Sequence, residues 1–192
     1  MLDVAPSDLP DVLILTPRRF GDARGWFSES WNAARMAQAG LVFDFVQDNH
    51  SFSAEKGTLR GLHYQKPPRA QDKLVRCTRG AIFDVAVDVR IGSPTYGRWT
   101  GVELSAENGR QLLVPKGFLH GFVTLGPDTE VQYKCSDVYA PDCDGSVMWN
   151  SCGIVWPEGC FDTALGPVLS DKDRKAEPFA TFRSPFVYGE RA

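Results

Sequence analysis

The sequence predicts an all-β protein that folds as an antiparallel sandwich or barrel with one or few short helices. Short segments rich in β-branched and aromatic residues recur along the chain, and turn signals separate them about every 8–12 residues. Only one segment carries convincing helix signals. The length of 192 residues suits one domain or at most two. We therefore expect a single domain over residues 1–192, with a loop-rich C-terminal segment from about residue 137.

The composition is that of an ordinary soluble globular protein, with 43% hydrophobic and 23% charged residues. The chain has 24 acidic and 21 basic residues, and its net charge of -3 gives no general attraction to nucleic acid or anionic lipid. No apolar stretch approaches the roughly 20 residues of a membrane span. The N-terminus lacks the basic start and apolar run of a signal peptide. We expect neither a nucleic-acid partner nor a membrane partner.

The chain has five cysteines, at positions 77, 135, 143, 152 and 160. The number is odd, no C-x-x-C pair occurs, and the spacing of a zinc site is missing. Free thiols in a reducing cytoplasm are the simplest interpretation. We expect each cysteine to act as a small buried hydrophobic residue.

The N-terminal part predicts strands and the single helix. The apolar run at residues 12–15 lies between two prolines and is typical of a short strand. Two glycines and an aspartate within residues 21–25 indicate a turn, and the aromatic residues of 26–31 return to a strand-like pattern. Asn32 is placed to cap a short helix over residues 33–38.

From residue 42 onward the patterns favour β structure. The clearest two-residue period spans residues 82–89. One face of that segment carries Phe83, Val85, Val87 and Val89, and the other carries Asp84, Ala86 and Asp88. Further strands are expected near residues 59–65, from residue 74, and at 99–104, 111–114, 121–125 and 130–136.

The C-terminal segment is irregular and rich in glycine and proline. We expect Trp149 and Trp156 to cover one opening of a barrel, and the charged residues 169–173 to follow a long loop. The tail at residues 185–192 is expected to be loosely held.

His63 and Lys73 are the centre of the predicted chemistry. His63 belongs to the strand-like run 59–65, and a proline-stiffened loop then leads to Lys73 at the start of the next run. An imidazole base and an ammonium group that face one cavity suit removal of a proton beside a carbonyl, because the base takes the proton and the cation holds the enolate oxygen. A lone histidine on a strand is, however, more often a hydrogen-bonded structural residue.

A carboxylate partner would orient His63 and stabilise its protonated form. Asp84, Asp88 and Asp173 are candidates, and sequence spacing does not choose among them. Tyr133 alternates with Val131, so both face the interior if one does. A phenol there is either a proton donor or a structural aromatic residue.

His120 lies between turn glycines and could be a metal ligand, a second base or a plain hydrogen-bonding residue. The chain has three histidines and no H-x-H pair, so a metal site lacks positive support. Arg24, Arg60 and Lys172 could converge with Lys73 on a phosphate. Strict alternation puts Arg60 and His63 on opposite faces, unless Gly61 allows a bulge or twist.

Several longer motifs in a fixed order resemble the dTDP-4-dehydrorhamnose 3,5-epimerase family, from about residue 16 to residue 173. The motifs are G-D-x-R-G at 21–25, Q-D-N-H-S at 47–51, L-R-G-L-H-Y-Q at 59–65, K-L-V-R at 73–76, F-D-V-A-V-D at 83–88, L-S-A-E-N at 104–108, P-x-G-F-x-H-G-F at 115–122, Y-K-C at 133–135 and L-S-x-K-D at 169–173. The resemblance implies a cupin-type jelly roll (double-stranded β-helix), a homodimer, no metal and no organic cofactor. It also implies the substrate dTDP-4-dehydro-6-deoxy-D-glucose, whose dTDP-4-keto-6-deoxy sugar is epimerised at C3 and C5.

The resemblance also implies residue roles. His63 corresponds to the base and Asp173 to its orienting partner; Tyr133 corresponds to the acid on the opposite sugar face and Lys73 to the holder of the C4 enolate. Substrate-contacting positions are matched by Arg24, Glu29, Gln47, Asn49, Arg60, His120, Tyr139, Asp144 and Lys172. Arg24 and Glu29 are expected to act across the dimer. Asp144 stands where the family commonly has glutamate, and its shorter side chain is expected to reach the substrate through water or not at all.

Three alternatives remain open. The same residues could serve an epimerase that acts on one centre, at C3 or C5. A non-catalytic jelly roll would bind a nucleotide sugar or glycan without proton exchange. A metal-dependent cupin would contain stoichiometric metal and lose activity to a chelator, although the missing H-x-H pair argues against it.

Overall fold

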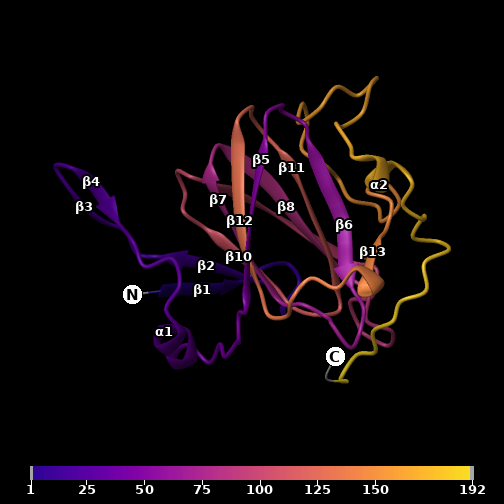
Figure 1. The fold of residues 1–192 in the computed structure, drawn as a ribbon, viewed down its shortest axis with the longest axis horizontal. Helices are drawn as coiled ribbons and strands as arrows, with labels where there is room; N and C mark the ends of the chain where they lie inside the picture. The colour runs from indigo at the N-terminus through magenta and orange to yellow at the C-terminus, as the bar shows by residue number, and fades with distance from the viewer. Residues whose placement is uncertain (1, 191–192) are drawn as a thin grey trace.

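Two antiparallel sheets face each other in the computed structural model, which describes residues 2–190 (Figure 1). The first sheet has the order β1 (Leu2–Pro6), β2 (Leu13–Pro17), β10 (Gln111–Val114), β7 (Lys73–Arg79), β12 (Thr129–Cys135) and β5 (Gln47–Ser53). The second has the order β13 (Asp144–Ser146), β6 (Leu59–Gln65), β11 (Phe118–Thr124), β8 (Ala81–Asp88) and β9 (Trp99–Ser105). This arrangement is the predicted all-β jelly roll.

The remaining elements are short. A two-stranded hairpin pairs β3 (Phe20–Asp22) with β4 (Gly25–Phe27). The helices are α1 (Ala33–Gln38) and α2 (Asp171–Arg174), and one 3-10 turn spans Pro141–Cys143. None of the helices within residues 2–190 is long and apolar enough to cross a membrane.

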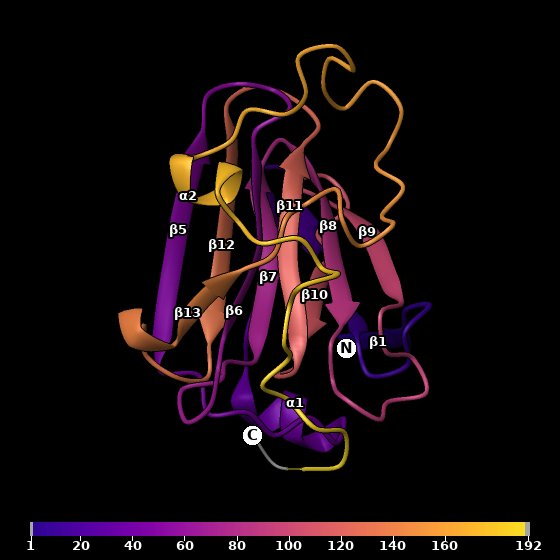
Figure 2. The ribbon, with the colours of Figure 1, turned by 90° about the vertical axis from the view of Figure 1, so that its right-hand side faces the viewer.

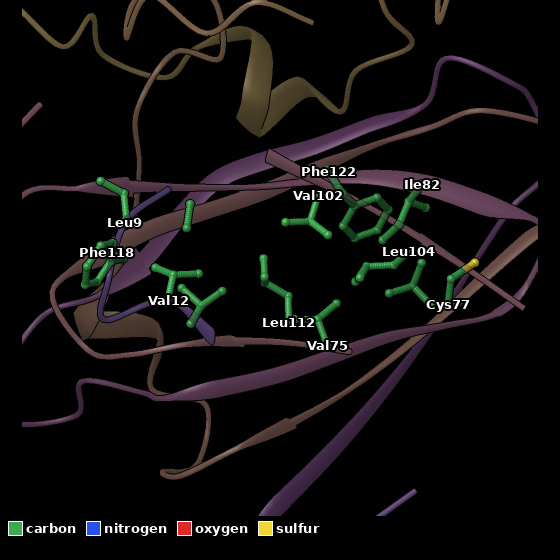
Figure 3. Close-up of a cluster of buried hydrophobic side chains, with 13 residues drawn as sticks. Leu9, Val12, Val75, Cys77, Ile82, Val102, Leu104, Leu112, Phe118 and Phe122 are labelled. Atoms are coloured by element: carbon green, nitrogen blue, oxygen red, sulfur yellow. The ribbon is translucent and has the colours of Figure 1, made fainter. Parts of the chain in front are cut away.

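The apolar core lies between the sheets (Figure 3). Alternating residues of β7, β8 and β11 point into it, including Val75, Ile82 and Phe122. Asp84 and Asp88 lie on the same inner face of β8 as Ile82, and both are fully buried. The predicted alternation of β8 is therefore correct, but its polar face points to the protein interior.

The opposite face of the second sheet is also covered. The C-terminal segment runs across its strands (Figure 2), and Phe182 and Phe186 pack with Val85, Val87 and Leu119. Burial on both faces explains why β8 and β11 are apolar almost throughout.

Two expectations about the C-terminal segment are wrong. Trp149 and Trp156 contact each other, and Trp156 packs on Phe83, so they cover the outer face of the sheet instead of a barrel opening. The tail is held as far as residue 190, because Phe186 is buried, its carbonyl accepts a hydrogen bond from the Ile91 N–H, and the Tyr188 N–H donates to the Ile91 carbonyl. Residues 191 and 192 of the predicted tail lie outside the described residues.

The helix predicted at residues 33–38 is confirmed, with the Asn32 side chain accepting a hydrogen bond from the backbone N–H of Arg35. It packs with residues 39–46 over the apolar outer face of the first sheet, where Phe43 and Phe45 contact Trp31 or each other. Residues 42–46 and 28–31 are not strands, although their aromatic content suggested it. The aromatic residues in these two segments form part of the apolar layer that covers the first sheet.

The β3–β4 hairpin projects from the body of the protein (Figure 1) and exposes Trp26 and Phe27 by 60% and 66%. Arg19 lies at its base, with its guanidinium 4.1 Å from the centre of the Trp26 ring. All five cysteines are free, and all but Cys143 are buried. The expectation of small buried residues therefore holds for four of them.

Candidate active site

A cavity of about 400 Å³ opens between the two sheets beside the apolar core. Seven of the predicted site residues line it: Arg60, His63, Lys73, His120, Tyr133, Lys172 and Asp173. They come from four strands and from α2, so residues 113 positions apart in the chain meet at one place. Apolar walls are added by Leu59, Phe122, Val168 and Leu169.

An irregularity in β6 brings Arg60 and His63 to the same cavity. The register between β6 and β11 shifts between His120 and Phe122, opposite Gly61. Gly61 has φ of 137°, and a Cβ atom there would lie 2.6 Å from the Cα of Gly121. Only glycine fits this conformation and this close approach. The structure thus contains the bulge at Gly61 that allows Arg60 and His63 to face one cavity.

His63 is paired with Asp173. The distance between His63 Nε2 and Asp173 Oδ1 is 2.6 Å, and Asp173 is 3% exposed against 29% for the His63 side chain. Ser170 fixes the carboxylate, because its hydroxyl donates to Asp173 Oδ2 at 2.8 Å and accepts from the Asp173 backbone N–H at 3.1 Å. Asp173 therefore gains its position from the capped first turn of α2.

The surroundings of His63 favour the neutral ring. Burial lowers the pKa of His63, Asp173 opposes that shift, and the positive charges of Lys73 and Lys172 add to it. Burial alone would raise the pKa of Asp173, but the hydrogen bonds and charge of His63, with Ser170 and Lys172, bring it below its usual value. An ionised Asp173 can only accept, so Nε2 carries the proton and Nδ1 keeps a free lone pair.

Lys73 begins β7 and faces the same cavity. Burial lowers the pKa of its ammonium group, while Cys135, Asp144 and Asp84 act to raise it. The ammonium form of Lys73 is therefore less favoured in the cavity than in water.

Tyr133 points inward with Val131, as alternation predicted, and packs against the core between the sheets. Burial raises the pKa of its phenol, while Arg60 and Asn49 act in the opposite direction. The hydroxyl thus keeps its proton at neutral pH and is available as a donor.

His120 lies in the middle of β11, so the expectation that it sits between turns is wrong. Its Nε2 is 2.8 Å from Asp84 Oδ1, and both side chains are buried. Asp84 is thus the partner of His120, and Asp88 bonds to Arg90, Ser93 and Thr95. Among the three candidate carboxylates, Asp173 alone orients His63.

Four further predicted residues, Gln47, Asn49, Tyr139 and Asp144, are connected to the cavity through Lys172 by a chain of side-chain contacts. Asp144 forms an ion pair with Lys172 and accepts a hydrogen bond from the Tyr139 hydroxyl at 3.3 Å. Gln47 accepts from the backbone N–H of Tyr139 at 2.8 Å and donates to Asn49 at 3.1 Å. These contacts connect β5, β13 and α2 around one opening.

Arg24 and Glu29 are not brought to this cavity. Arg24 lies on the exposed β3–β4 hairpin with a side chain 90% exposed, and its guanidinium pairs with Asp22. Glu29 pairs with Arg35 and accepts from Asn32, next to α1. Within one chain, neither side chain lines the site.

Sequence reasoning assigned no role to the other residues that line the cavity, among them Ser170, Ser51 and Phe122. Ser170 caps α2, and the spacing of a serine three positions before Asp173 is a capping signal that could have revealed this helix. Ser51 and Phe122 line the wall from β5 and β11. The Ser51 hydroxyl is buried without a hydrogen-bond partner in the described structure. Its place in the Q-D-N-H-S motif at 47–51 was the signal that could have pointed to it.

No group of three or more histidine, cysteine, aspartate or glutamate side chains within residues 2–190 is arranged to hold a metal ion. His63 and His120 each bond to their own carboxylate, and each carboxylate is engaged within the protein.

The family model described as dTDP-4-dehydrorhamnose 3,5-epimerase matches residues 6–181. The chain is 51% identical to the dTDP-4-dehydrorhamnose 3,5-epimerase of Salmonella typhimurium over 179 residues, which cover 92% of this chain and 94% of that one. A similar crystal structure is that of dTDP-6-deoxy-D-glucose-3,5-epimerase from Legionella pneumophila in complex with dTDP-4-keto-L-rhamnose. It has a TM-score of 0.90, 40% identity and full coverage of both chains. ChmJ, a 3'-monoepimerase from Streptomyces bikiniensis in complex with dTDP-quinovose, has a TM-score of 0.83 and 38% identity, covering 92% of this chain and 87% of its own.

Proposed function

The chain belongs to the dTDP-4-dehydrorhamnose 3,5-epimerase family, and on that premise we propose that it epimerises C3 and C5 of dTDP-4-dehydro-6-deoxy-D-glucose. The product is dTDP-4-dehydro-L-rhamnose, and the enzyme is a carbohydrate isomerase. The observation that carries the mechanism is the His63–Asp173 pair, 2.6 Å apart, in one cavity with Lys73 and Tyr133.

The chemistry needs a base, an acid and a cation. The C4 ketone makes the hydrogens on C3 and C5 acidic, because loss of either proton gives an enolate whose charge rests on the C4 oxygen. Reprotonation from the other face of the sugar inverts the centre. No electron is transferred and the ammonium group of Lys73 supplies the positive charge at the C4 oxygen, so the reaction as proposed needs neither a metal nor an organic cofactor.

His63 is the proposed base. Burial and the nearby ammonium groups keep the ring neutral near pH 7, and Asp173 holds the proton on Nε2. Nδ1 is then free to take the sugar proton. Asp173 stabilises the imidazolium that forms, as a carboxylate partner does in other histidine-based mechanisms.

Lys73 is the proposed holder of the enolate. A positive charge close to the C4 oxygen stabilises the negative charge that develops in the transition state, and a water-poor site increases its effect. Tyr133 is the proposed acid, because burial keeps its phenol protonated and it enters the cavity from β12, in the sheet opposite to that of His63.

The other residues around the opening are proposed to bind the nucleotide sugar. Arg60, His120 and Lys172 line the cavity, and Gln47, Asn49, Tyr139 and Asp144 are connected to Lys172 by a chain of contacts. In the structure without substrate, the Asp144 carboxylate is occupied by its ion pair with Lys172. We propose that Lys172 exchanges this carboxylate for the substrate's diphosphate.

A homodimer is the proposed assembly. Arg24 lies far from its own chain's site on a projecting hairpin whose exposed Trp26 and Phe27 are apolar. Such a hairpin suits contact with a second copy, where Arg24 and Glu29 would complete the partner's cavity. A cytoplasmic location stays a prediction.

A heavy-water experiment tests the proposed function. The purified protein is incubated in D₂O with the dTDP-4-keto-6-deoxy sugar, and NMR follows the hydrogens on C3 and C5. Double epimerisation predicts deuterium at both carbons and formation of the L-configured product. Absence of label at both carbons would contradict the enzyme assignment and favour a non-catalytic binding protein.

The second candidate function is epimerisation at a single centre. It is favoured by the similarity to ChmJ, whose description as a 3'-monoepimerase on a closely similar fold indicates that this scaffold serves both outcomes. Label at one carbon only in the same experiment would select it.

A further inference from the structure

Four hydrogen-bonding side chains form a patch on the inner faces of β5 and β12. The register of these antiparallel strands places Gln47 directly opposite Cys135. It places Asn49 directly opposite Tyr133. Side chains paired in this way are about 4.5–5.5 Å apart at Cβ and contact each other. Because Tyr133 lines the cavity, the patch extends from the proposed acid along the wall of the active site.

The orientation of the two amides is set from one end of this patch. The backbone N–H of Tyr139 donates to Gln47 Oε1 at 2.8 Å, and a backbone N–H can only donate. Gln47 therefore presents its NH₂ group to Asn49, whose Oδ1 accepts at 3.1 Å. The NH₂ group of Asn49 is consequently directed toward β12, so that side of the amide offers donors and no acceptor.

The two N–H bonds of Asn49 have different acceptors available on β12. One of them faces Cys135, at a distance of 3.5 Å between Nδ2 and Sγ, and sulfur is a weak acceptor. The hydroxyl oxygen of the directly opposite Tyr133 is the stronger acceptor. Burial raises the pKa of the Tyr133 phenol, and a hydrogen bond from the Asn49 side chain acts in the opposite direction. An amide donor at this oxygen favours the phenolate and leaves the phenol hydrogen to point elsewhere.

We propose that Gln47 and Asn49 are positioning residues for the acid: Gln47 holds the Asn49 amide with its NH₂ group toward the Tyr133 oxygen, and Asn49 thereby directs the phenol hydrogen into the cavity. The inference rests on the proposed epimerase function. When Tyr133 delivers its proton, the O–H bond breaks, a C–H bond forms on the sugar, the C4 ketone is restored and the negative charge moves from the enolate to the phenolate. The Asn49 donor stabilises that charge, and a proton from solvent restores the phenol before the next turnover.

The Gln47→Glu variant tests the proposal without altering Tyr133 or its direct neighbour. A carboxylate at position 47 has no donor, so Asn49 must turn its NH₂ group toward position 47 and its carbonyl oxygen toward β12. Proton removal by His63 is expected to continue, whereas delivery from Tyr133 is slowed. The enolate then more often takes a deuteron back from His63, whose side chain is 29% exposed and can exchange with solvent.

The quantity to measure is the ratio of exchange to inversion. Each variant is incubated in D₂O with the dTDP-4-keto sugar, and NMR gives the deuterium in recovered substrate relative to the inverted product formed. We expect this ratio to rise about tenfold or more in Gln47→Glu and in Asn49→Asp, the worth of one hydrogen bond to an ionised group. Weaker substrate binding or a less stable fold lowers both quantities together and leaves the ratio unchanged.

Gln132→Glu is the matched control. Gln132 precedes Tyr133 in β12, but its side chain lies on the outer face of the strand, where Oε1 accepts from Arg76 at 2.7 Å. The substitution adds the same charge, keeps that acceptor and is expected to leave the ratio at its wild-type value. A wild-type ratio in folded Gln47→Glu, or an equal rise in Gln132→Glu, would overturn the positioning role.

A measurement on the wild type covers variants that fail to fold. In ¹⁵N-labelled protein, the side-chain NH₂ hydrogens of Asn49 are expected to show NOE contacts with the ring hydrogens of Tyr133. Contacts of that NH₂ group with Gln47 and none with Tyr133 would overturn the inference. The NOE does not depend on turnover, so a wild type that takes up no deuterium contradicts the proposed function and is distinguished from a wrong amide orientation.

Discussion

Two histidine–aspartate pairs face one cavity, and they differ in almost every physical respect. His63–Asp173 joins strand β6 to the short helix α2, while His120–Asp84 joins neighbouring strands of one sheet. The distances between the paired atoms are similar, 2.6 Å and 2.8 Å. The His63 side chain is 29% exposed, however, and the His120 side chain only 7%.

The surroundings of the two carboxylates explain the difference. Both oxygens of Asp173 are satisfied, one by His63 and the other by the Ser170 hydroxyl. Asp84 has one oxygen on His120 and one without a partner. A fully satisfied carboxylate next to a partly exposed ring suits a base that gains and loses a proton. A buried carboxylate that holds a buried ring suits a group that keeps its histidine in a fixed orientation.

Pairing with a carboxylate does not by itself identify a catalytic histidine. What separates the two pairs is access to the cavity and the local balance of charge, which neither residue type nor sequence spacing encodes.

The largest expected effect is that of His63→Ala. Loss of a general base lowers turnover by roughly 10²–10⁴, because the group that accepts the sugar proton is removed. Turnover is measured by coupled product formation, and a circular-dichroism melt checks that the variant is folded. Near-normal turnover of a folded variant would remove His63 from its role.

Lys73→Met is expected to lower kcat by about 10²–10³, the usual worth of one donor at a developing oxyanion. The substitution preserves much of the volume of the side chain and removes its charge. Steady-state kinetics separate this loss from a change in KM. An unchanged kcat would show that the enolate is stabilised by another group.

The pH dependence sharpens the contrast between the pairs. A base must be neutral to act, so the rate falls as the pH decreases through the pKa of His63. Burial lowers that pKa, so the acid limb of kcat/KM should lie below about 6.5, the ordinary imidazole value. Asp173 opposes the shift, and the Asp173→Asn variant should move the limb further down while reducing the rate. A limb that moves up in this variant would contradict the charge assignment.

The smallest effect is expected for Ser170→Ala. The variant removes the cap of α2 and the hydrogen bond to Asp173 Oδ2. A lost N-cap lowers the free energy of unfolding by about 0.5–2 kcal/mol, and the looser Asp173 should reduce turnover modestly. Asn108→Ala is the control, since it removes two side-chain contacts to backbone N–H groups in the β9–β10 turn. It should lower the unfolding free energy without reducing turnover. Equal effects of both variants on turnover would show that the cap has no special link to the site.

Much of the fold could be predicted from local patterns. The alternation in β8, the helix capped by Asn32 and the strand over Gln111–Val114 all follow from residue type and spacing. The failures share a cause. Phe43 and Phe45 resemble a strand locally and Phe186 resembles loose coil, but these aromatic side chains pack on the outer faces of the two sheets.

The candidate site, too, could be predicted only in part from the sequence. The meeting of His63, Lys73 and Tyr133 in one cavity was expected from strand alternation and from family motifs. The choice of Asp173 over Asp84 as partner of His63 could not come from spacing, because it depends on how α2 folds back over β6. The separation of Arg24 from the cavity is likewise a matter of where a hairpin points, which a linear motif does not record.

The most direct test of the different roles of the two pairs compares His63→Asn with His120→Asn in one deuterium-exchange experiment. Each variant is incubated in D₂O with the dTDP-4-keto sugar, and the initial rate of label uptake at C3 is measured by NMR. We expect His63→Asn to lose at least about 10² in rate. His120→Asn should stay within about tenfold of the wild type, the worth of one neutral hydrogen bond to the substrate. Equal losses in both variants, or a greater loss in His120→Asn, would contradict the assignment of His63 as the base and His120 as a positioned binding group.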